Sequence, residues 1–344
     1  MRAAILRAGQ IVVDDVRDPT PAPGQVLVET IACGICGSDL HCRLHAHDFV
    51  AASKASGMTI FDFDPDADLV MGHEFSARVV DLGAGVDGVA VGAAVVAHPV
   101  LVTDRGVRAI GYANELAAGY AERMVLDATR LLPVPNGVDP RWAALTEPMA
   151  VGLHAVNASW VDRTHSAVVL GCGPVGLAVL AALRVRGVPL VVAADFSPAR
   201  RALAAQRGAH VVVDPSVTPA MDAYRAAGGG EGPTVLFDAV GVPGMIDAAM
   251  TSATRNSQVL VVGLCMQHDR IWPAVAINKE ITLSFVLGWT PDEFRDSLLG
   301  IAEGRLDVAP LITADVGLEG VAAAFDELAN PERHAKVLVR PNGI

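Results

Sequence analysis

The sequence predicts an α/β protein of two domains, a β-rich domain followed by one built on a parallel, doubly wound sheet. The chain of 344 residues is long enough to form two separate cores. Its first part contains short strand-like runs separated by glycines, whereas strands and helices alternate after about residue 141. We therefore expect a first domain at 1–150, completed by 287–344, and a second domain at 151–286.

The first domain is expected to be an all-β, barrel-like structure. Residues 26–31 and 75–80 are rich in apolar and β-branched side chains, as expected of strands. Residues 143–156 read as a helix that ends this pattern. The turns between the strand-like runs are marked by glycines, at positions 24, 83, 85, 88 and 92. The chemistry of this domain is therefore expected in its loops.

The second domain alternates strands and helices in the way that builds a parallel sheet. After it come two helices, at 292–303 and 318–328, and a last strand at 336–339, which we expect to rejoin the first domain. Within the second domain, strands are predicted at 166–171, 190–194, 210–213, 235–240 and 259–263, and helices at 174–186 and 198–206.

Composition excludes several classes of protein. The formal net charge is −12, whereas nucleic-acid binding needs clustered Lys and Arg, so we expect no nucleic-acid partner. Five cysteines, odd in number and unevenly spread, fit a reducing compartment better than a disulfide framework. The sequence opens with no long apolar stretch and no cleavage pattern. We therefore expect no signal peptide and a cytoplasmic location.

We also expect no membrane-spanning segment. The longest uncharged apolar run, residues 167–183, approaches the length of a transmembrane helix. It is interrupted by Gly171, Gly173, Pro174 and Gly176, which fit one sharp turn. A buried strand followed by a buried helix explains the run.

That turn has the spacing of a dinucleotide-binding loop. Gly171, Gly173 and Gly176 follow a predicted strand, and Pro174 and Val175 open a predicted helix. The glycines permit the tight turn and let the backbone approach a pyrophosphate, which the helix N-terminus then faces. The sequence therefore predicts a dinucleotide cofactor.

Asp195 indicates which dinucleotide is bound. It lies about 20 residues after Gly176, at the end of the next strand, where its carboxylate can accept hydrogen bonds from both ribose hydroxyls. The same charge repels a 2′-phosphate, so NAD is favoured over NADP. Arg200 is expected to flank the adenosine, although Arg200 and Arg201 could instead receive a 2′-phosphate.

A second group of residues suits a catalytic Zn²⁺, which takes three protein ligands and keeps one position open. Cys36 and His73 are the strongest candidates, and Glu74 and Glu147 compete for the third place. Cys33 and Cys36 could also form a redox dithiol or half of a structural zinc site. The β-rich context and the lack of a second cysteine pair argue against both alternatives.

Two further side chains in the same segment could move a proton. Ser38 offers a hydroxyl, and His41 offers an imidazole three positions later. A metal that polarises an alcohol, together with a cofactor that accepts a hydride, implies an alcohol-type dehydrogenase.

At these residues the chain resembles the zinc-dependent medium-chain dehydrogenases, the alcohol and sorbitol dehydrogenase superfamily. The resemblance covers nearly the whole chain and implies a GroES-like catalytic domain and a Rossmann NAD-binding domain. The matching motifs are G-I-C-G-S-D-L-H at 34–41, G-H-E at 72–74, T-E-P at 146–148, the glycine turn, and K-V-L-V at 336–339.

The resemblance implies a role for each residue of the metal site. Cys36 and His73 would bind zinc, and Glu147 stands where alcohol dehydrogenases place a third, cysteine ligand. Glu74 would ligate the metal directly or exchange with water. Asp39 would orient His73 and fix its tautomer.

The resemblance also implies how the reaction proceeds. Zinc would lower the pKa of the substrate hydroxyl, the proton would leave through Ser38, the cofactor ribose and His41, and a hydride would pass to the nicotinamide. Lys336 would meet the pyrophosphate, or it would instead be a surface lysine that pairs with a carboxylate. The loops that flank the nicotinamide would contain Val240, Val262, Gly263 and Leu264.

The chain departs from that family in two places near the metal site. Relatives with a structural zinc carry four clustered cysteines in a lobe that here lies between about residues 98 and 120 and contains none. We therefore expect one catalytic zinc per subunit and no structural zinc. The segment between Cys36 and His73 is also longer than usual. Its extra residues, 45–68, could cap the substrate site, form a subunit contact or be a passive insertion.

A third departure concerns the substrate. Sorbitol dehydrogenases place an Arg-Tyr pair after the last strand of the cofactor domain, where this chain has Trp289. An indole offers one donor and a large apolar face, and Tyr120 is expected to line the same pocket. We expect a relatively apolar secondary alcohol, or its ketone, as substrate. The alternatives are a polyol dehydrogenase and, with less support, a zinc-independent quinone or enoyl reductase on the same fold.

Association is inferred from the same resemblance. Relatives form dimers or tetramers, often through the edge of the cofactor-domain sheet near 259–272. We therefore expect a homodimer or homotetramer.

Overall fold

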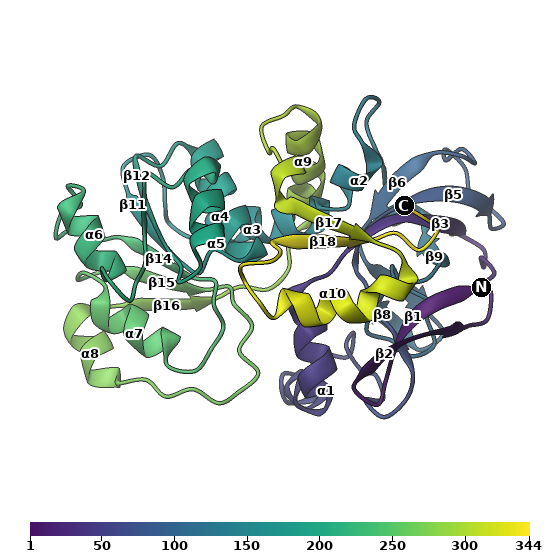
Figure 1. The fold of residues 1–344 in the computed structure, drawn as a ribbon, viewed down its shortest axis with the longest axis horizontal. Helices are drawn as coiled ribbons and strands as arrows, with labels where there is room; N and C mark the ends of the chain where they lie inside the picture. Colours follow the sequence, from purple (N-terminus) through teal and green to yellow (C-terminus); the bar gives the residue numbers. More distant parts are fainter. The chain divides into compact units, whose positions relative to one another are not determined.

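The structure, a computed structural model, describes all residues 1–344 and divides into two compact units (Figure 1). The first boundary lies after Glu147 rather than after residue 150, and the second lies within helix α9 (Pro291–Ala302) rather than at residue 287. Unit 1 comprises Met1–Glu147, Leu298–Asn330 and Lys336–Ile344, and unit 2 comprises Pro148–Ser297 and Pro331–Ala335.

Unit 1 consists mainly of strands, as the sequence predicts. Its helices are α1 (Gly37–Ala55), α2 (Pro140–Ala143) and α10 (Val321–Leu328), with single 3₁₀ turns at Ala128–Arg130, Ala309–Leu311 and Leu318–Gly320. Its strands are β1 (Arg2–Arg7), β2 (Gln10–Asp15), β3 (Gln25–Gly34), β4 (Leu69–Val70), β5 (Glu74–Leu82), β6 (Ala94–Ala97), β7 (Val100–Thr103), β8 (Gly106–Ala109), β9 (Arg123–Asp127), β10 (Leu131–Pro133), β17 (Ile312–Val316) and β18 (Lys336–Val339).

Strand β3 organises the largest sheet of unit 1. The strand order is β10-β6-β5-β3-β18-β17, and β9 also pairs with β3. Buried residues alternate with less buried ones along β3, because one face of the strand packs on the core. At its end, Gly34 lies opposite Glu74 of β5 and opposite Leu338 of β18. This register brings three segments that are distant in sequence to one end of the sheet.

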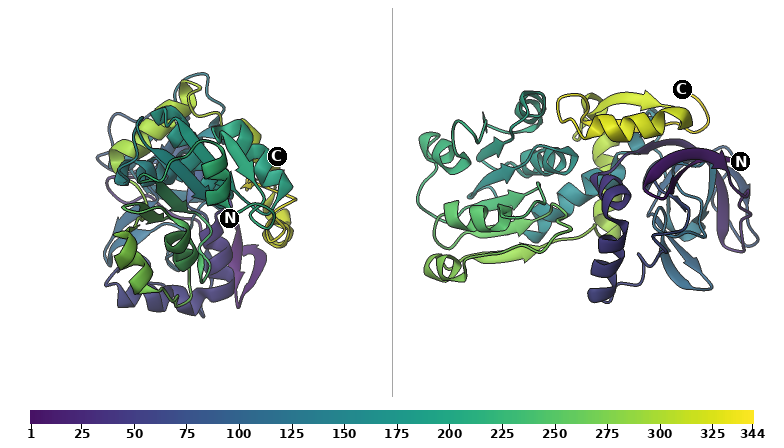
Figure 2. Two further views of the ribbon diagram at one scale, coloured as in Figure 1. Left: turned by 90° about the vertical axis from the view of Figure 1, so that its left-hand side faces the viewer. Right: turned by 60° about the horizontal axis from the view of Figure 1, so that its bottom comes forward.

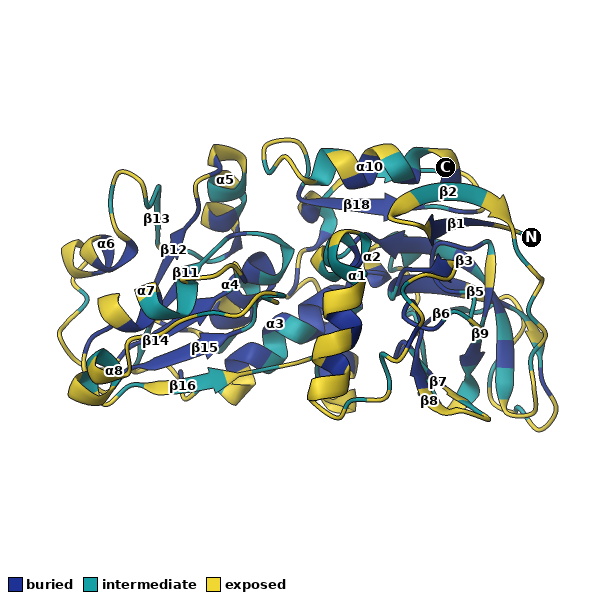
Figure 3. Cartoon of the chain, turned by 90° about the horizontal axis from the view of Figure 1, so that it is seen from below, coloured by how far each residue is buried: buried dark blue, intermediate teal, exposed yellow.

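Helix α1 follows β3 directly and includes the first part of the predicted insertion, 45–68. The helix is the long dark-blue one in Figure 2, and its backbone leaves helical geometry at His45. Asp39 caps the first turn by accepting a hydrogen bond from the backbone N–H of Cys36 at 3.0 Å. The remainder of the insertion, residues 56–68, consists of turns and irregular backbone. One side of α1 is exposed along most of its length (Figure 3).

Unit 2 is a parallel sheet with helices between its strands, which confirms the doubly wound fold predicted from the sequence. The strand order is β13-β12-β11-β14-β15-β16, and every neighbouring pair is parallel. The strands are β11 (Ser166–Leu170), β12 (Leu190–Ala194), β13 (Val211–Val213), β14 (Val235–Asp238), β15 (Gln258–Val261) and β16 (Thr282–Phe285). Besides α9, the helices are α3 (Thr146–Ala158), which begins in unit 1, α4 (Pro174–Arg186), α5 (Pro198–Arg207), α6 (Ala220–Ala226), α7 (Met245–Ser252) and α8 (Pro273–Lys279).

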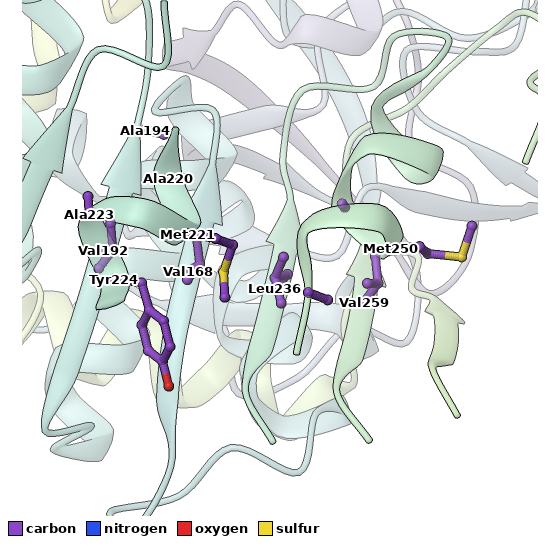
Figure 4. Packing of buried hydrophobic residues seen from close by; sticks show 12 residues of the cluster. Val168, Val192, Ala194, Ala220, Met221, Ala223, Tyr224, Leu236, Met250 and Val259 are labelled. Carbon is purple, nitrogen blue, oxygen red and sulfur yellow. The ribbon is translucent and has the colours of Figure 1, made fainter. Parts of the chain in front are cut away.

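The core of unit 2 lies between its central strands and the helices that cover them. Figure 4 shows Val168, Val192 and Val259 from three strands beside Met221 of α6 and Met250 of α7. All five are almost fully buried, and burial of such side chains stabilises the sheet by roughly 1.5–3 kcal/mol each. The sheet thus gives the loops at its strand ends a rigid base.

No helix of the structure has both the length and the apolar character needed to cross a membrane.

Candidate active site

The structure brings together three of the four predicted metal ligands. Cys36, His73 and Glu74 each offer a ligand atom, and these atoms lie within 4.8 Å of one another. Cys36 precedes the first turn of α1, whereas His73 and Glu74 stand at the start of β5. A Cβ atom at Gly34 would overlap the carboxylate of Glu74, so the cluster requires glycine at that position of β3.

Glu147, the fourth candidate, is not part of this cluster. It lies in the first turn of α3, and its charge contributes to raising the pKa of Lys336. Glu147 is therefore close enough to act electrostatically on the site. Glu74 is the carboxylate that the geometry groups with Cys36 and His73.

Asp39 holds His73, as the resemblance implies. The Nδ1 atom of His73 lies 3.5 Å from Oδ1 of Asp39, and no hydrogen bond satisfies this buried nitrogen. Burial alone would lower the pKa of His73, but Asp39 and Cys36 raise it well above its usual value. Because Nδ1 faces Asp39, Nε2 is the ring nitrogen left for a metal.

The charges of the cluster also fit a divalent cation. Metal binding requires a neutral His73 and a Cys36 thiolate, and in that state Cys36, Glu74 and Asp39 would carry three negative charges and Lys336 one positive charge. The balance is two negative charges in a largely buried site, which is costly without a counter-ion. Thiolate, imidazole and carboxylate are the ligands that zinc takes in proteins. The residues present therefore fit a catalytic zinc.

Lys336 pairs with a carboxylate of the metal cluster. Its Nζ donates to both carboxylate oxygens of Glu74, at 2.8 and 2.7 Å, and to the carbonyl of Ile35 at 3.0 Å. The side chain is 2% exposed, and an ammonium has only three donors. The structure thus shows Lys336 paired with a carboxylate, which is the second of the two roles expected for it, because the pairing of β18 with β3 turns this lysine toward Glu74.

Tyr120 differs from its prediction. The residue is fully buried, its hydroxyl donates to Oδ2 of Asp39 at 2.6 Å, and its ring packs edge-on against Phe325. Burial would raise the pKa of Asp39, but His73, Tyr120 and the Cys36 backbone together lower it. Tyr120 thus supports the carboxylate behind His73 instead of lining a substrate pocket.

The two predicted proton-transfer residues lie on the first turns of α1. Ser38 is half-buried and accepts a hydrogen bond from the hydroxyl of Tyr112 at 2.7 Å. His41 is half-buried one turn later, and burial, followed by the charge of His45, lowers its pKa. Tyr112 is a site residue that was not predicted from the sequence. Its only local signal is an aromatic side chain directly after Gly111, in the lobe without cysteines.

In unit 2 the glycine turn has the predicted geometry. Gly171 adopts a φ of +89°, and a Cβ at Gly176 would overlap the Gly171 carbonyl, so both positions need glycine. Gly173 precedes α4, whose first two residues are Pro174 and Val175. The N-terminus of α4 therefore opens directly at the turn, as an anion site requires.

Asp195 closes this turn at the end of β12. Its Oδ2 accepts from the Cys172 backbone at 2.7 Å and its Oδ1 from the Ser197 backbone at 2.8 Å. Each carboxylate oxygen keeps a further lone pair for a ribose hydroxyl. The guanidinium of Arg201 donates hydrogen bonds to Asp214 and to nearby backbone carbonyls. The guanidinium of Arg200 lies beside the glycine turn, 3.9 Å from where a Cβ of residue 173 would be.

The loops predicted to flank the nicotinamide lie next to each other at the ends of β14 and β15. The backbone N–H groups of Val262 and Gly263 donate to the carbonyl of Asp238. The backbone N–H of Val240 donates to the carboxylate of Asp238. A Cβ at Gly241 would lie 2.7 Å from the carbonyl oxygen of Leu264. Trp289, the predicted pocket residue, is half-buried after β16, with its ring 4.8 Å from that of Phe294.

A β-rich unit with a buried cluster of potential metal ligands and a unit with a glycine turn of the dinucleotide-binding type are the features of an alcohol-type dehydrogenase. Two family models match the chain: the alcohol dehydrogenase GroES-like domain at residues 22–136 and the zinc-binding dehydrogenase at residues 174–303. The chain belongs to the zinc-dependent medium-chain dehydrogenase superfamily, and it is an oxidoreductase.

Individual relatives match over nearly the full chain. The (R,R)-butanediol dehydrogenase of Bacillus subtilis is 33% identical over 340 residues, with 96% of each chain covered. That of Neisseria gonorrhoeae is 28% identical, with 99% of this chain and 100% of the relative covered. Among solved structures, 2R,3R-butanediol dehydrogenase from Bacillus subtilis superposes with a TM-score of 0.85 at 31% identity, covering 99% of both chains. A zinc-binding dehydrogenase from Sinorhizobium meliloti 1021, bound to NADP, gives 0.84 at 27% identity and the same coverage.

Proposed function

We propose that the protein interconverts a small secondary alcohol and its ketone, with one catalytic zinc per subunit and NAD as the preferred cofactor. The observation that carries the proposal is the cluster of Cys36, His73 and Glu74. Both relatives described as butanediol dehydrogenases match over nearly their full length, which supports a short diol or hydroxyketone as substrate. A longer polyol is the second candidate, because a sorbitol dehydrogenase of Bacillus subtilis is also similar, at 24% identity.

Residues of unit 1 have separate roles at the metal site. When bound, zinc supplies a Lewis acid that acidifies the substrate hydroxyl, and the nicotinamide supplies the hydride acceptor. Cys36, His73 and Glu74 would hold the metal, and Asp39 would keep the His73 ring in the orientation that leaves Nε2 free. Lys336 compensates the charge of Glu74. Ser38 accepts the proton that leaves the substrate, and His41 passes a proton on.

Glu74 is proposed as the third ligand, with Glu147 as the alternative. Only Glu74 places an oxygen within 4.8 Å of the other two ligand atoms. Glutamine keeps the size of either side chain while removing its charge, so Glu74→Gln and Glu147→Gln form a matched pair. Zinc content after dialysis against a graded chelator should fall for Glu74→Gln and stay near the wild-type value for Glu147→Gln. The reverse order would assign the ligand to Glu147.

The preference for NAD rests on Asp195. Its carboxylate lies at the glycine turn, where it can bind ribose hydroxyls and repel a 2′-phosphate. Arg200 lies beside the same turn and would favour NADP if it acted alone. The carboxylate is the more strongly fixed of the two groups, since two backbone N–H groups hold it.

Self-association is proposed through the free edge of the unit 2 sheet. Strand β16 pairs only with β15, and an edge strand offers unpaired backbone groups to a partner. Large apolar side chains are exposed on and around it: Ile271, Trp272, Ile277, Phe285 and Leu287. A second copy of the chain would cover them and form a homodimer or homotetramer.

Purified protein tests the function directly. Zinc per subunit is measured by elemental analysis, and NADH formation is followed with the stereoisomers of 2,3-butanediol, simple secondary alcohols, sorbitol and other polyols. We expect chelator-sensitive turnover that is fastest with short diols or secondary alcohols. Turnover that ignores the chelator, or that occurs only with enones and a reduced cofactor, would instead indicate a zinc-independent reductase.

A further inference from the structure

The hydroxyl of Tyr112 lies at the junction between the metal cluster and Ser38. Tyr112 is 4% exposed, and its hydroxyl is 2.7 Å from Oγ of Ser38 and 3.4 Å from Oδ1 of Asp39. A phenol has a single hydrogen to donate, and hydroxyl hydrogen bonds are strongest near 2.7 Å. The Ser38 oxygen is therefore the acceptor.

The ring of Tyr112 is held by the insertion 45–68. It stacks on Phe49 of α1, with centroids 5.1 Å apart and planes 12° apart, and meets Phe61 edge-on at 5.5 Å. Phe63 packs at 6.3 Å. On its other side the ring lies 5.4 Å from that of His73. Aromatic pairs at such distances are stabilising beyond their buried area, so the insertion fixes where the phenol hydroxyl lies.

Polar contacts tie the insertion to the lobe that carries Tyr112. Arg108 of β8 donates to the carbonyl of Asp62 and to Glu115. The side chain of Asn114 donates to the carbonyls of Asp64 and Asp68 and accepts from the Asp64 backbone at 2.7 Å. The lobe, which has no cysteines, is thus held by the insertion through a packed aromatic group and charged hydrogen bonds.

We infer that Tyr112 is a positioning residue for the Ser38 hydroxyl, and that the insertion 45–68 serves to hold it there. A serine oxygen that accepts from Tyr112 must direct its own hydrogen to a different acceptor. When the Ser38 oxygen takes a proton from the substrate, it releases its own hydrogen toward His41, and Tyr112 keeps its hydrogen throughout. The inference rests on the proposed function, because it assigns Ser38 to that proton transfer.

The hydroxyl of Tyr112 is suited to be a permanent donor. A phenol with the ordinary pKa of about 10 is already protonated near neutral pH. The hydroxyl therefore has a hydrogen to donate to Ser38. It can stabilise electron density on the Ser38 oxygen without exchanging a proton itself.

The test is a double-mutant cycle between Tyr112→Phe and Ser38→Ala in the zinc-loaded protein. Tyr112→Phe removes only the hydroxyl, so we expect kcat to fall roughly 5- to 20-fold, as for one lost hydrogen bond. Bound zinc and the Kd for NADH should stay within twofold of wild type, and the solvent deuterium isotope effect on kcat should rise. In the Ser38→Ala background, Tyr112→Phe should change kcat less than twofold. Tyr224→Phe, a buried tyrosine in the core of unit 2, is the matched control and should leave kcat unchanged.

Three results would overturn the inference: additive losses in the cycle, an unchanged kcat for Tyr112→Phe, or loss of zinc from that variant. A denaturant-unfolding cycle of the same variants, without metal, provides a readout that needs no activity. If the wild type turns over no alcohol but the two hydroxyls are coupled in unfolding, the proposed function fails while the Tyr112–Ser38 bond stands. If no coupling is found, the inference itself fails.

Discussion

Replacing Lys336 by methionine should destabilise the protein strongly, because it would leave a buried carboxylate without its counter-charge. Lys336 and Glu74 are 2% and 1% exposed, and the ammonium bonds both carboxylate oxygens. Methionine fills most of the lysine volume, so the charge is the main change. Removing one partner of a buried pair costs about 3–5 kcal/mol. We therefore expect a loss of about that size in the free energy of unfolding.

The assay is urea denaturation of the metal-free protein at pH 7, followed by circular dichroism. The double variant Lys336→Met with Glu74→Gln removes both charges and should recover most of the loss. Arg255→Met breaks the exposed pair of Arg255 and Glu280 and should leave stability near the wild-type value. A single Lys336→Met variant within about 1 kcal/mol of wild type would refute the buried pair.

The same pair has a defined pH dependence. Burial alone would lower the pKa of Lys336, but Glu74 and Cys36 raise it above the usual lysine value of 10.5. A raised pKa means that the stabilisation is fully present below 10.5 and is lost as pH rises through the folded-state pKa. The stability difference between wild type and the single variant Lys336→Met should therefore be constant from about pH 7 to 9 and shrink above about 10.5. A difference that shrinks already below pH 9 would contradict this.

Three further predictions concern the other sites. Asp195→Gly should weaken NADH binding at least tenfold more than NADPH binding, measured by cofactor fluorescence, because the lost contact with the ribose hydroxyls concerns NADH. The lost contacts with the backbone affect both cofactors equally. Equal losses of affinity for the two cofactors would show that Asp195 does not bind the ribose. Gly34→Ala should abolish zinc binding and cost about 1–3 kcal/mol of stability, since its Cβ overlaps a ligand carboxylate, whereas Gly37→Ala, with nothing within 4 Å, should keep zinc. Retained zinc in both would disprove the crowding argument. Phe285→Asp should convert an oligomer to monomers in light scattering, and Val102→Asp, at an exposed site in unit 1, should not. A monomeric wild type would contradict the interface.

Local patterns made much of the fold and part of the site predictable. The glycine turn, its helix and Asp195 lie within one strand–helix–strand unit, so spacing alone placed them. Cys36 and Asp39 are likewise joined by the capping of a single helix turn. The alternation of strands and helices gave the parallel sheet of unit 2, because most of its strands are continuous apolar runs. The edge strand β16 and the short helices α6, α7 and α8 were not predicted.

Contacts between distant segments were not predictable in the same way. Tyr120 is three residues from Arg123 of β9, and nothing in that segment shows that its hydroxyl meets Asp39, which is 81 positions away. Tyr112 meets Ser38 across 74 positions. Such contacts depend on strand register and on how an insertion packs, and neither is encoded in a local run of residues. The local sequence does not distinguish a tyrosine that lines a pocket from one that supports a residue of the metal site.

The register of β3 explains why these distant residues form one site. Gly34 pairs with β5 on one side and β18 on the other, so the segments carrying Glu74 and Lys336 approach the same point from opposite edges of one strand. Two oppositely charged side chains delivered to one buried position form an ion pair, because neither can reach water. The basic residue at the start of β18 therefore pairs with Glu74. The register of β3 thus accounts for the ion pair between Lys336 and a member of the metal cluster.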